Sequence, residues 1–545
     1  MKTKSSYCSN RKMYNCWLKY VVIYMSILST VGLIIVYFYF QSIDPKILNE
    51  PTVVWDHMET STYQGKRYVH LDLKGAPPKV SYYRYLFSIF AEVGIRGILI
   101  EYEDMFPFKG NSFNNLSALN AYSVGDIKVI NNLAQENNLE IIPLVPVFGE
   151  LEFALKLDEF KHLREIPELP QVVCPSNVES MELITEMVMQ VIEAHPNLRA
   201  IHIGGGEILY LGRCKKCKEK INSLKISKED LYLQHIKMLC NFIRHKYPKM
   251  SILIWDDQLR YLLDEESQNR FHDFNIIPVV KQFDSDVFDK LGSPLWNEYA
   301  KYFTKIWIAS AFKGATGVDD YIVNVAHYMQ NHRSWMSVID NYKYSVNFSA
   351  IIITGLQRYN HFSTLCELLP VALPSLVMNL KILESKDINH LEASKQVGKI
   401  FKCQQAYALM GPSLGTPRCS FPGSEILENV YRLHQLIDDF KQIAQSLEVK
   451  GWMSSFNSHY GFSSPEHVMR VATQLNHFEK EINEIENDMS RALLDVYDAF
   501  TKNEWIFTYI LPLKRQISEL QRTKAKCLSK NIWPRKPFNN RILEN

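Results

Sequence analysis

A lone acid that follows three glycines is the first place where this sequence could carry out chemistry. Residues 200–207 read Ala-Ile-His-Ile-Gly-Gly-Gly-Glu, so the carboxylate of Glu207 comes directly after Gly206. Glycines allow a tight turn and a close approach of the backbone to a ligand. A carboxylate placed there can donate or accept a proton. The segment is therefore interpreted either as a turn that carries a charge or as the rim of an active site.

Other acids and aromatic residues follow short apolar runs in the same way. Taken singly, each is also explained as a surface charge or a helix N-cap, and His202 as a core histidine with its hydrogen bonds satisfied. Jointly they indicate a carbohydrate site, because aromatic faces stack on sugar rings and carboxylates accept hydrogen bonds from hydroxyls. The expected substrate-contacting residues are Asp72, Glu101, Glu103, Glu150, His202, Trp255, Asp256, Asp257 and Tyr359.

The elements that must position these residues alternate between short apolar runs and amphipathic stretches. Continuous apolar runs of this length are typical of parallel strands that are buried on both faces. Strand and helix alternate eight times, which predicts a (β/α)₈ TIM barrel whose active site lies at the carboxyl ends of the strands. The predicted strands are 68–73, 97–101, 140–145, 200–204, 251–255, 276–280, 305–310 and 351–354, and the clearest helices are 124–137, 177–194 and 228–246.

The regions on either side of the barrel have a different pattern. We expect a barrel over residues 65–385 and a helical C-terminal domain over 386–545, where residues 424–449 and 465–501 are helical with no strands between them. Residues 20–40 contain no charge, and as a helix they would be about 32 Å long, enough to cross a bilayer. The residues before them are basic, so the positive-inside rule predicts a cytosolic tail over 1–19. A stalk over 41–64 then follows on the far side of the membrane.

This topology predicts a single-pass type II membrane protein whose main domain is lumenal, in the Golgi or secretory pathway, or extracellular. A cleaved signal peptide is the alternative, but its apolar part is usually shorter, about 7–15 residues. The sequons at Asn115 and Asn347 are compatible with a lumenal domain.

Composition excludes several other classes of function. The chain has 545 residues, is 46% hydrophobic and carries a formal net charge of +2, so it is globular and lacks the basic surface that a nucleic-acid partner requires. No metal or cofactor is expected, because the glycines before Glu207 lack the spacing of a nucleotide-binding loop. Cys214 and Cys217 form half of a zinc motif with no visible second half. A local disulfide is the expectation there, and two free thiols are the alternative.

Several segments together resemble glycoside hydrolase family 20, the β-N-acetylhexosaminidases, and most closely its hexosaminidase D branch. His202–Glu207 is similar to the H-x-G-x-D-E motif of that family. Further similar segments are VHLDLKGAPPKVSY at 69–82, LIEYEDMFPF at 99–108, IWDDQLR at 254–260, SAFKGATG at 310–317, TGLQRYNHFSTLCELLP at 354–370 and SFPGSEIL at 420–427.

The resemblance implies a barrel enzyme that removes a terminal N-acetylhexosamine, GlcNAc or GalNAc, from a glycan or glycoconjugate. In the family, the 2-acetamido oxygen of the substrate attacks the anomeric carbon, and the configuration is retained. By position, Glu207 corresponds to the general acid and base. The aspartate that orients the acetamido group corresponds to Gly206, so this side chain is absent.

Five further positions depart from the branch. Glu150 stands in place of a histidine, Leu356 in place of a tryptophan, Asn360 in place of an aspartate, and Lys281-Gln282 in place of a Trp-Asp pair. Two alternatives follow. The chain is a β-N-acetylhexosaminidase with slow or altered activity, or it is a catalytically inactive relative that binds glycans or a partner through the same cleft.

Overall fold

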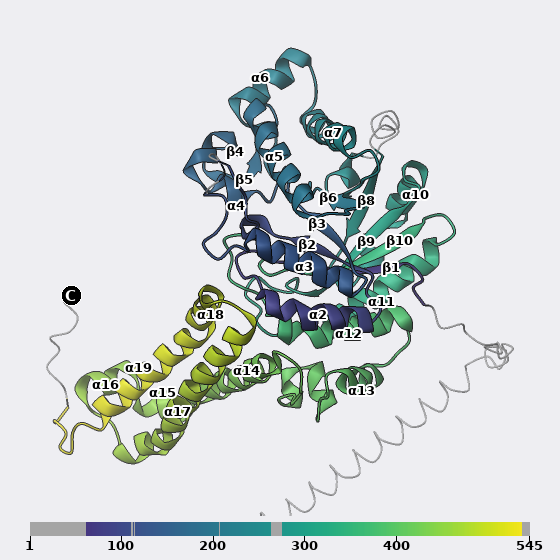
Figure 1. Cartoon of the computed structure of the whole chain (residues 1–545). Helices are drawn as coiled ribbons and strands as arrows, with labels where there is room; N and C mark the ends of the chain where they lie inside the picture. Colours follow the sequence, from purple (N-terminus) through teal and green to yellow (C-terminus); the bar gives the residue numbers. More distant parts are fainter. Residues whose placement is uncertain (1–61, 111–112, 114, 207, 263–274, 537–545) are drawn as a thin grey trace, which may run out of the picture. The chain divides into compact units, whose positions relative to one another are not determined.

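The computed structural model describes residues 62–536 except 111–112, 114, 207 and 263–274 (Figure 1). Glu207, the predicted tail, the predicted membrane helix at 20–40 and the stalk up to residue 61 lie outside the described residues. Among the residues that are described, no helix is both long and apolar enough to span a membrane.

Eight parallel strands close into a barrel, as the alternating pattern predicts. Their order around the barrel is β1-β10-β9-β8-β7-β6-β3-β2, with β2 pairing back onto β1. The eight predicted runs all fall on these strands, and the boundaries differ by at most three residues. The strands are β1 Lys66–Asp72, β2 Gly97–Glu101, β3 Glu140–Leu144, β6 Ala200–His202, β7 Ser251–Trp255, β8 Ile276–Lys281, β9 Ile306–Lys313 and β10 Phe348–Gly355.

Alternating side chains explain why each run is apolar throughout. On β7, Ile252 and Ile254 pack outward in the large core between strands and helices. Leu253 and Trp255 face a second, smaller core inside the barrel, where Tyr68 stacks on Trp307 at 4.7 Å between ring centroids. Both faces of the strand are therefore buried, as expected for a parallel barrel.

Helices surround the barrel and connect its strands. Two of them begin with a capping box, in which Ser123 pairs with Asp126 and Ser227 with Asp230. The helices are α2 Val80–Glu92, α3 Val124–Glu136, α4 Glu152–Leu155, α5 Val178–Ala194, α6 Lys215–Leu224, α7 Lys228–Lys246, α9 Val287–Lys290, α10 Ser293–Tyr302, α11 Val325–Tyr342 and α12 Leu369–Glu384, with short 3₁₀ turns at Glu103–Met105, Asp158–Leu163 and Leu259–Tyr261.

An antiparallel hairpin that the sequence analysis did not predict lies between β3 and β6. Its strands are β4 Arg164–Ile166 and β5 Leu169–Val173. The hairpin packs against α4 through a backbone hydrogen bond from Leu151 to Gln171. It therefore sits in the connection that leads to the Gly204–Gly206 turn.

The residues after α12 are helical, but the long predicted helices are interrupted. Ser446 caps α15 directly after α14 ends, and Asp498 caps α18 two residues after α17 ends. Phe440 on α14 packs edge-on against Phe478 on α17. The elements are α13 His390–Ile400, η5 Ala406–Met410, η6 Pro412–Leu414, α14 Ser424–Ala444, α15 Leu447–Trp452, α16 Ser455–Tyr460, α17 Pro465–Val496, α18 Ala499–Trp505, η7 Ile506–Ile510 (a π-helix) and α19 Leu511–Cys527.

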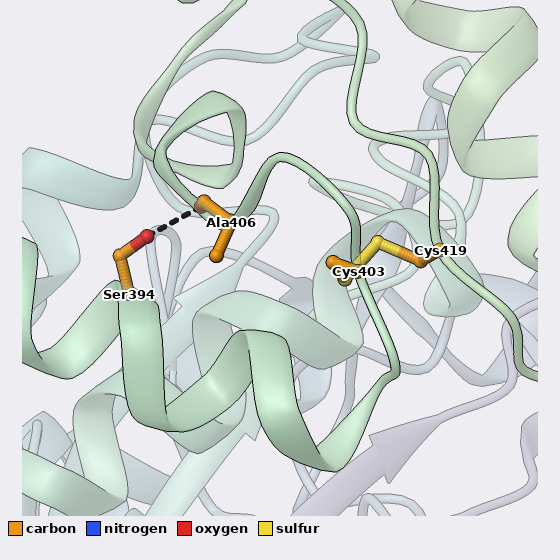
Figure 2. The surroundings of a disulfide bond; sticks show 4 residues. All are labelled: Ser394, Cys403, Ala406 and Cys419. Carbon is orange, nitrogen blue, oxygen red and sulfur yellow. Dashed lines mark hydrogen bonds between the residues drawn. A yellow bond between two sulfur atoms is a disulfide. The ribbon is translucent and has the colours of Figure 1, made fainter.

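The cysteine pairing differs from the expectation. Cys403 and Cys419 form a disulfide that closes the loop after α13, and Ser394 on that helix donates a hydrogen bond to the carbonyl of Ala406 in the same loop (Figure 2). Cys214 and Cys217 are free thiols, so the disulfide expected between them is not formed. Instead, Cys214 caps α6 and its sulfur accepts a hydrogen bond from the Cys217 N–H.

Candidate active site

A cavity of about 510 Å³ opens at the carboxyl ends of the barrel strands. Five of the predicted residues line it: Glu101, Glu150, Trp255, Asp257 and Tyr359. A second cavity, of about 600 Å³, lies at the amino ends and is lined by residues such as Lys66, Arg96 and Asn197. Barrel enzymes carry their chemistry at the carboxyl ends, so the first cavity is the candidate active site.

Lys74 is the centre of a buried charge network on one side of this cavity. Its ammonium nitrogen lies 3.2 Å from Asp72, 3.1 Å from Glu101 and 3.7 Å from Glu103. Asp72 also accepts a hydrogen bond from the Gln357 N–H, which joins the end of β1 to the loop after β10. Of the three acids, only Glu101 lines the cavity, and Asp72 and Glu103 are joined to it through Lys74.

The network shifts the pKa values of its two glutamates in opposite directions. Burial opposes charge on Lys74, but the three carboxylates raise its pKa well above the usual value. Burial would raise the pKa of Glu101, yet Lys74 and His70 lower it to about 2. Burial raises the pKa of Glu103 well above its usual value, and Lys74 offsets this only partly. Glu101 is therefore ionised, and its carboxylate pairs with Lys74 and His70 at the cavity wall.

Glu103, Asp104 and His361 form an adjoining cluster that could hold a cation by residue type alone. His361 bonds Glu103 at 2.8 Å, and Lys156 lies 2.9 Å from Asp104. Lys156 thus pairs with Asp104, and the Lys74 ammonium lies 3.7 Å from Glu103, so a lysine lies against each acid of this cluster.

Trp255 is an aromatic surface of the cavity, and His202 packs against it from outside the cavity lining. The two ring centroids lie 4.2 Å apart, and His202 accepts a hydrogen bond from the Gly204 N–H through Nδ1. Burial and the nearby His70 lower the pKa of His202, so its ring is neutral. His202 thus fixes the first turn of the glycine run and the tilt of Trp255, and it does not line the cavity.

Asp256 is fully buried beside the cavity, and both of its carboxylate oxygens accept hydrogen bonds. Arg260 donates two hydrogen bonds to its carboxylate, at 2.9 and 2.8 Å, and Tyr299 donates a third at 2.9 Å. Burial raises the pKa of Asp256 to about 6, and Arg260 opposes that rise. Asp256, predicted as a substrate contact, therefore forms an ion pair with Arg260 in the loop after β7 and does not line the cavity.

Asp257 faces the opposite way, toward Gly206. A Cβ added at position 206 would lie 2.5 Å from Asp257 Oδ2, so this carboxylate fills the space where a side chain at 206 would begin. Lys281 lies 3.1 Å from the same oxygen and 5.3 Å from the centre of the Trp255 ring. The departures at 206 and 281 are thus linked in space through Asp257.

The far wall combines an exposed aromatic residue with an aliphatic one. Tyr359 is 60% exposed at the cavity rim, and Leu356 lines the wall where the family pattern has tryptophan. Glu150 also lines the cavity, with a backbone φ of 58°. The cavity therefore offers acids, one aromatic surface and one aromatic edge.

Comparison with known proteins identifies the family of this chain. No family model matches the sequence. Hexosaminidase D from Homo sapiens is 33% identical over 488 residues, which cover 88% of this chain and 98% of the relative. Hexosaminidase D from Bos taurus is 43% identical over 319 residues, which cover 58% of this chain and 91% of the relative. The chain belongs to the hexosaminidase D family.

The hexosaminidase D assignment confirms the resemblance inferred from the motifs and places the chain in a family named for glycosidase activity. Solved structures are similar at a greater distance. The chitobiase from Flavobacterium johnsoniae has a TM-score of 0.48 and 12% identity over 85% of this chain and 72% of that chain. A β-N-acetylhexosaminidase from Bacteroides fragilis has a TM-score of 0.46 and 13% identity over 62% and 70% of the two chains. The sequence relatives establish the family.

Lys74 and Arg260 are the main residues of this hexosaminidase D site that the sequence analysis missed. Both lie within the quoted motifs, two residues after Asp72 and four after Asp256. A basic residue at such spacing from an acid that is expected to be buried is the signal that could have identified them, because buried carboxylates need a partner.

Proposed function

We propose that the chain is a β-N-acetylhexosaminidase that removes a terminal N-acetylhexosamine with retention of configuration. The observation that carries the proposal is the group of Glu101, Asp257, Trp255 and Tyr359 around one cavity next to the Gly204–Gly206 turn. A cavity of about 510 Å³ suits a single sugar ring and its neighbour.

The proposed reaction has two steps. In the first, the acetamido oxygen of the substrate attacks the anomeric carbon and forms an oxazolinium ring, while Glu207 donates its proton to the departing glycosidic oxygen. In the second, Glu207 removes a proton from water, the water oxygen bonds to the anomeric carbon, and the ring opens to restore the acetamide. Glu207 ends in its starting protonation state, as general acid and base catalysis requires.

Asp257 is the proposed replacement for the aspartate that is missing at position 206. Its Oδ2 already lies where a side chain at 206 would begin. From there a carboxylate can orient the acetamido N–H and stabilise the positive ring. Removing one such charge typically costs about 10²–10³ in rate, so activity depends on this substitution being effective.

A second candidate function is glycan binding without catalysis. Lys281 favours it, because a cation 3.1 Å from Asp257 neutralises the charge that the oxazolinium ring needs. The absence of a side chain at Gly206 also favours binding without catalysis, because no carboxylate at that position can orient the acetamido group.

The deciding experiment measures hydrolysis of p-nitrophenyl β-GlcNAc and β-GalNAc by the full-length chain in detergent. Glu207→Gln is compared with Glu219→Gln, a matched change at an exposed acid on α6. Hydrolysis by the parent that is abolished by Glu207→Gln but kept by Glu219→Gln supports the hydrolase proposal. A folded parent and a folded Gly206→Asp variant that are both inert contradict it, and glycan-array binding by that inert protein then supports the second candidate.

We also propose that residues 20–40 anchor the protein in a membrane with the barrel in the lumen or outside the cell. The uncharged stretch, its basic N-terminal flank and the sequons support this topology. Asn115 and Asn347 are both exposed, so a glycan at either position meets no core packing.

A further inference from the structure

Three thiols and one buried carboxylate meet between the β4–β5 hairpin and the start of α6. Glu165 belongs to β4, Cys174 follows β5 directly, Cys214 caps α6, and Cys217 lies in its first turn. One ligand atom from each of these residues lies within 4.8 Å of all the others. Cys174 and Glu165 thus supply the partners that the sequence around Cys214 and Cys217 lacks.

The separations are close to those of a metal site. The sulfur of Cys174 lies 3.2 Å from that of Cys214 and 3.6 Å from that of Cys217, and Glu165 Oε2 lies 3.2 Å from the Cys217 sulfur. Around a tetrahedral zinc ion, with zinc–sulfur bonds of about 2.3 Å, neighbouring sulfurs lie about 3.7 Å apart. Outward shifts of a few tenths of an ångström would therefore admit the ion.

The surroundings orient the ligand atoms toward one another. The N–H groups of Arg213 and Cys214 both donate to Glu165 Oε1, which leaves Oε2 directed at the thiols. The Cys217 N–H donates to the Cys214 sulfur, and Ser176 bonds the Cys217 sulfur at 3.1 Å. Hydrogen bonds of this kind fix the first ligands of a metal and tune its binding.

Burial makes the cluster costly without a cation. Glu165 is 1% exposed, Cys217 is 0% exposed, and no lysine or arginine of the described chain forms an ion pair with Glu165. Glu165 accepts hydrogen bonds from two backbone N–H groups and one thiol, but a buried carboxylate whose charge no cation balances is still unfavourable. The sequence around the two α6 cysteines is also basic, with Arg213, Lys215 and Lys216, which suits a site that stays net negative after a divalent ion binds.

We propose that Glu165, Cys174, Cys214 and Cys217 bind one structural Zn²⁺ ion. Binding releases the thiol protons to solvent, and neither an oxidant nor a reductant takes part. Thiolate-rich sites with four protein ligands select zinc, whereas magnesium and calcium take oxygen ligands and iron–sulfur clusters take cysteine sulfurs throughout. Four protein ligands close the coordination sphere, so the ion is structural and not catalytic.

The ion would cross-link the loop that follows the Gly204–Gly206 turn to the neighbouring hairpin. That loop runs to Cys214, and it alternates between Ile208 and Leu211, which pack against the core, and Leu209 and Tyr210, which are exposed. The metal would tie the end of the loop to the β4–β5 hairpin. The assignment goes beyond the proposed glycosidase activity and stands whether or not the chain is an enzyme.

The test measures metal content in the full chain, purified without chelators and without a polyhistidine tag. Mass spectrometry of the metals should find about one zinc per chain, and X-ray absorption should show sulfur neighbours at about 2.3 Å. Cys174→Ser should lower the zinc content at least fivefold. Cys240→Ala, at a buried free cysteine on α7 outside the cluster, should keep it.

A measurement on the parent protein covers the case in which Cys174→Ser does not fold. A mercurial reagent titrated into the parent should release zinc to a chromogenic dye in proportion to the thiols that react. A folded parent that contains less than a tenth of an equivalent of zinc after exposure to zinc chloride overturns the proposal. Peptide mapping that finds a disulfide among Cys174, Cys214 and Cys217 overturns it as well.

Discussion

Asp257 is the residue on which the proposed chemistry depends most. Its carboxylate fills the space beside Gly206 and is the acid best placed to orient an acetamido group. We expect Asp257→Asn to lower kcat/KM by about 10²-fold or more, with a smaller change in KM, because the lost charge acts on the positive intermediate. Asp284→Asn is the matched control, since Asp284 lines the same cavity away from Gly206. Equal effects of the two changes would contradict the role of Asp257.

Lys281 should restrain the same reaction. Its ammonium group pairs with Asp257 at 3.1 Å, where it offsets the negative charge. A partly exposed pair is worth about 1 kcal/mol, so Lys281→Gln should raise kcat/KM by about three- to tenfold. The measurement is steady-state hydrolysis of the p-nitrophenyl substrates. A loss of activity in a folded Lys281→Gln protein would show instead that the lysine contacts substrate.

Glu101 links the site to stability. Its folded pKa of about 2 lies below the ordinary value, so its stabilising effect is complete above about pH 4.5 and is lost as pH falls toward 2. We expect Glu101→Gln to cost about 3 kcal/mol at pH 7, because it breaks a buried ion pair. Urea unfolding at several pH values should show the gap from the parent narrowing below pH 4.5. Glu92→Gln, at an exposed residue ending α2, should give no such gap.

At the scale of elements, the loop after β10 is held by the C-terminal helices. Arg358, beside Tyr359, donates two hydrogen bonds to Glu504 on α18 and a third, of 2.7 Å, to the Lys74 carbonyl. The strand bridge between Pro78 and Tyr497 makes a second connection nearby. The helical region is therefore connected to the cavity rim through Arg358 and to the segment after β1 through Pro78.

This support can be measured with Glu504→Gln. The side chain of Glu504 is 35% exposed, so we expect a loss of about 1 kcal/mol in the free energy of unfolding rather than the value of a fully buried pair. Glu519→Gln, at an exposed residue of α19, is the control. Urea denaturation compares the two, and equal midpoints would mean that the Arg358–Glu504 pair adds nothing to stability.

The ease of prediction also differs between elements. The eight strands of the barrel were predictable because each is an apolar run between polar helices. The β4–β5 hairpin was not, since its strands are short and only half-buried. The breaks after Ala444 and Val496 were missed because Ser446 and Asp498 resemble ordinary surface residues until their caps are seen.

Side-chain contacts between distant segments account for what the sequence does not predict. The sequence indicates acids at the strand ends, but it does not tell that Asp256 turns to Arg260 while Asp257 turns to Gly206. Likewise Cys174 lies 40 residues before Cys214, so no spacing rule joins them. The hydrophobic periodicity of a sequence predicts its helices and strands. It does not predict which of two adjacent side chains faces the cavity, because that depends on packing between distant segments.

At the scale of the whole molecule, membrane insertion and glycosylation should depend on each other. If residues 20–40 anchor the chain with its barrel in the lumen, the full-length protein resists carbonate extraction from animal-cell membranes. Its mobility on a gel then increases after glycosidase F treatment. Asn115→Gln with Asn347→Gln should abolish that change in mobility and leave the protein in the membrane pellet.

Charges placed inside residues 20–40 distinguish a membrane anchor from a cleaved signal peptide. Leu28→Lys with Val31→Lys places two cations near the centre of the span, at about 2.5–3.5 kcal/mol each, and should prevent insertion. The variant should therefore lose carbonate resistance and both glycans together, because a chain that does not insert never exposes its sequons to the lumen. A parent that is glycosylated yet extracted by carbonate would contradict the anchor and identify the stretch as a cleaved signal peptide.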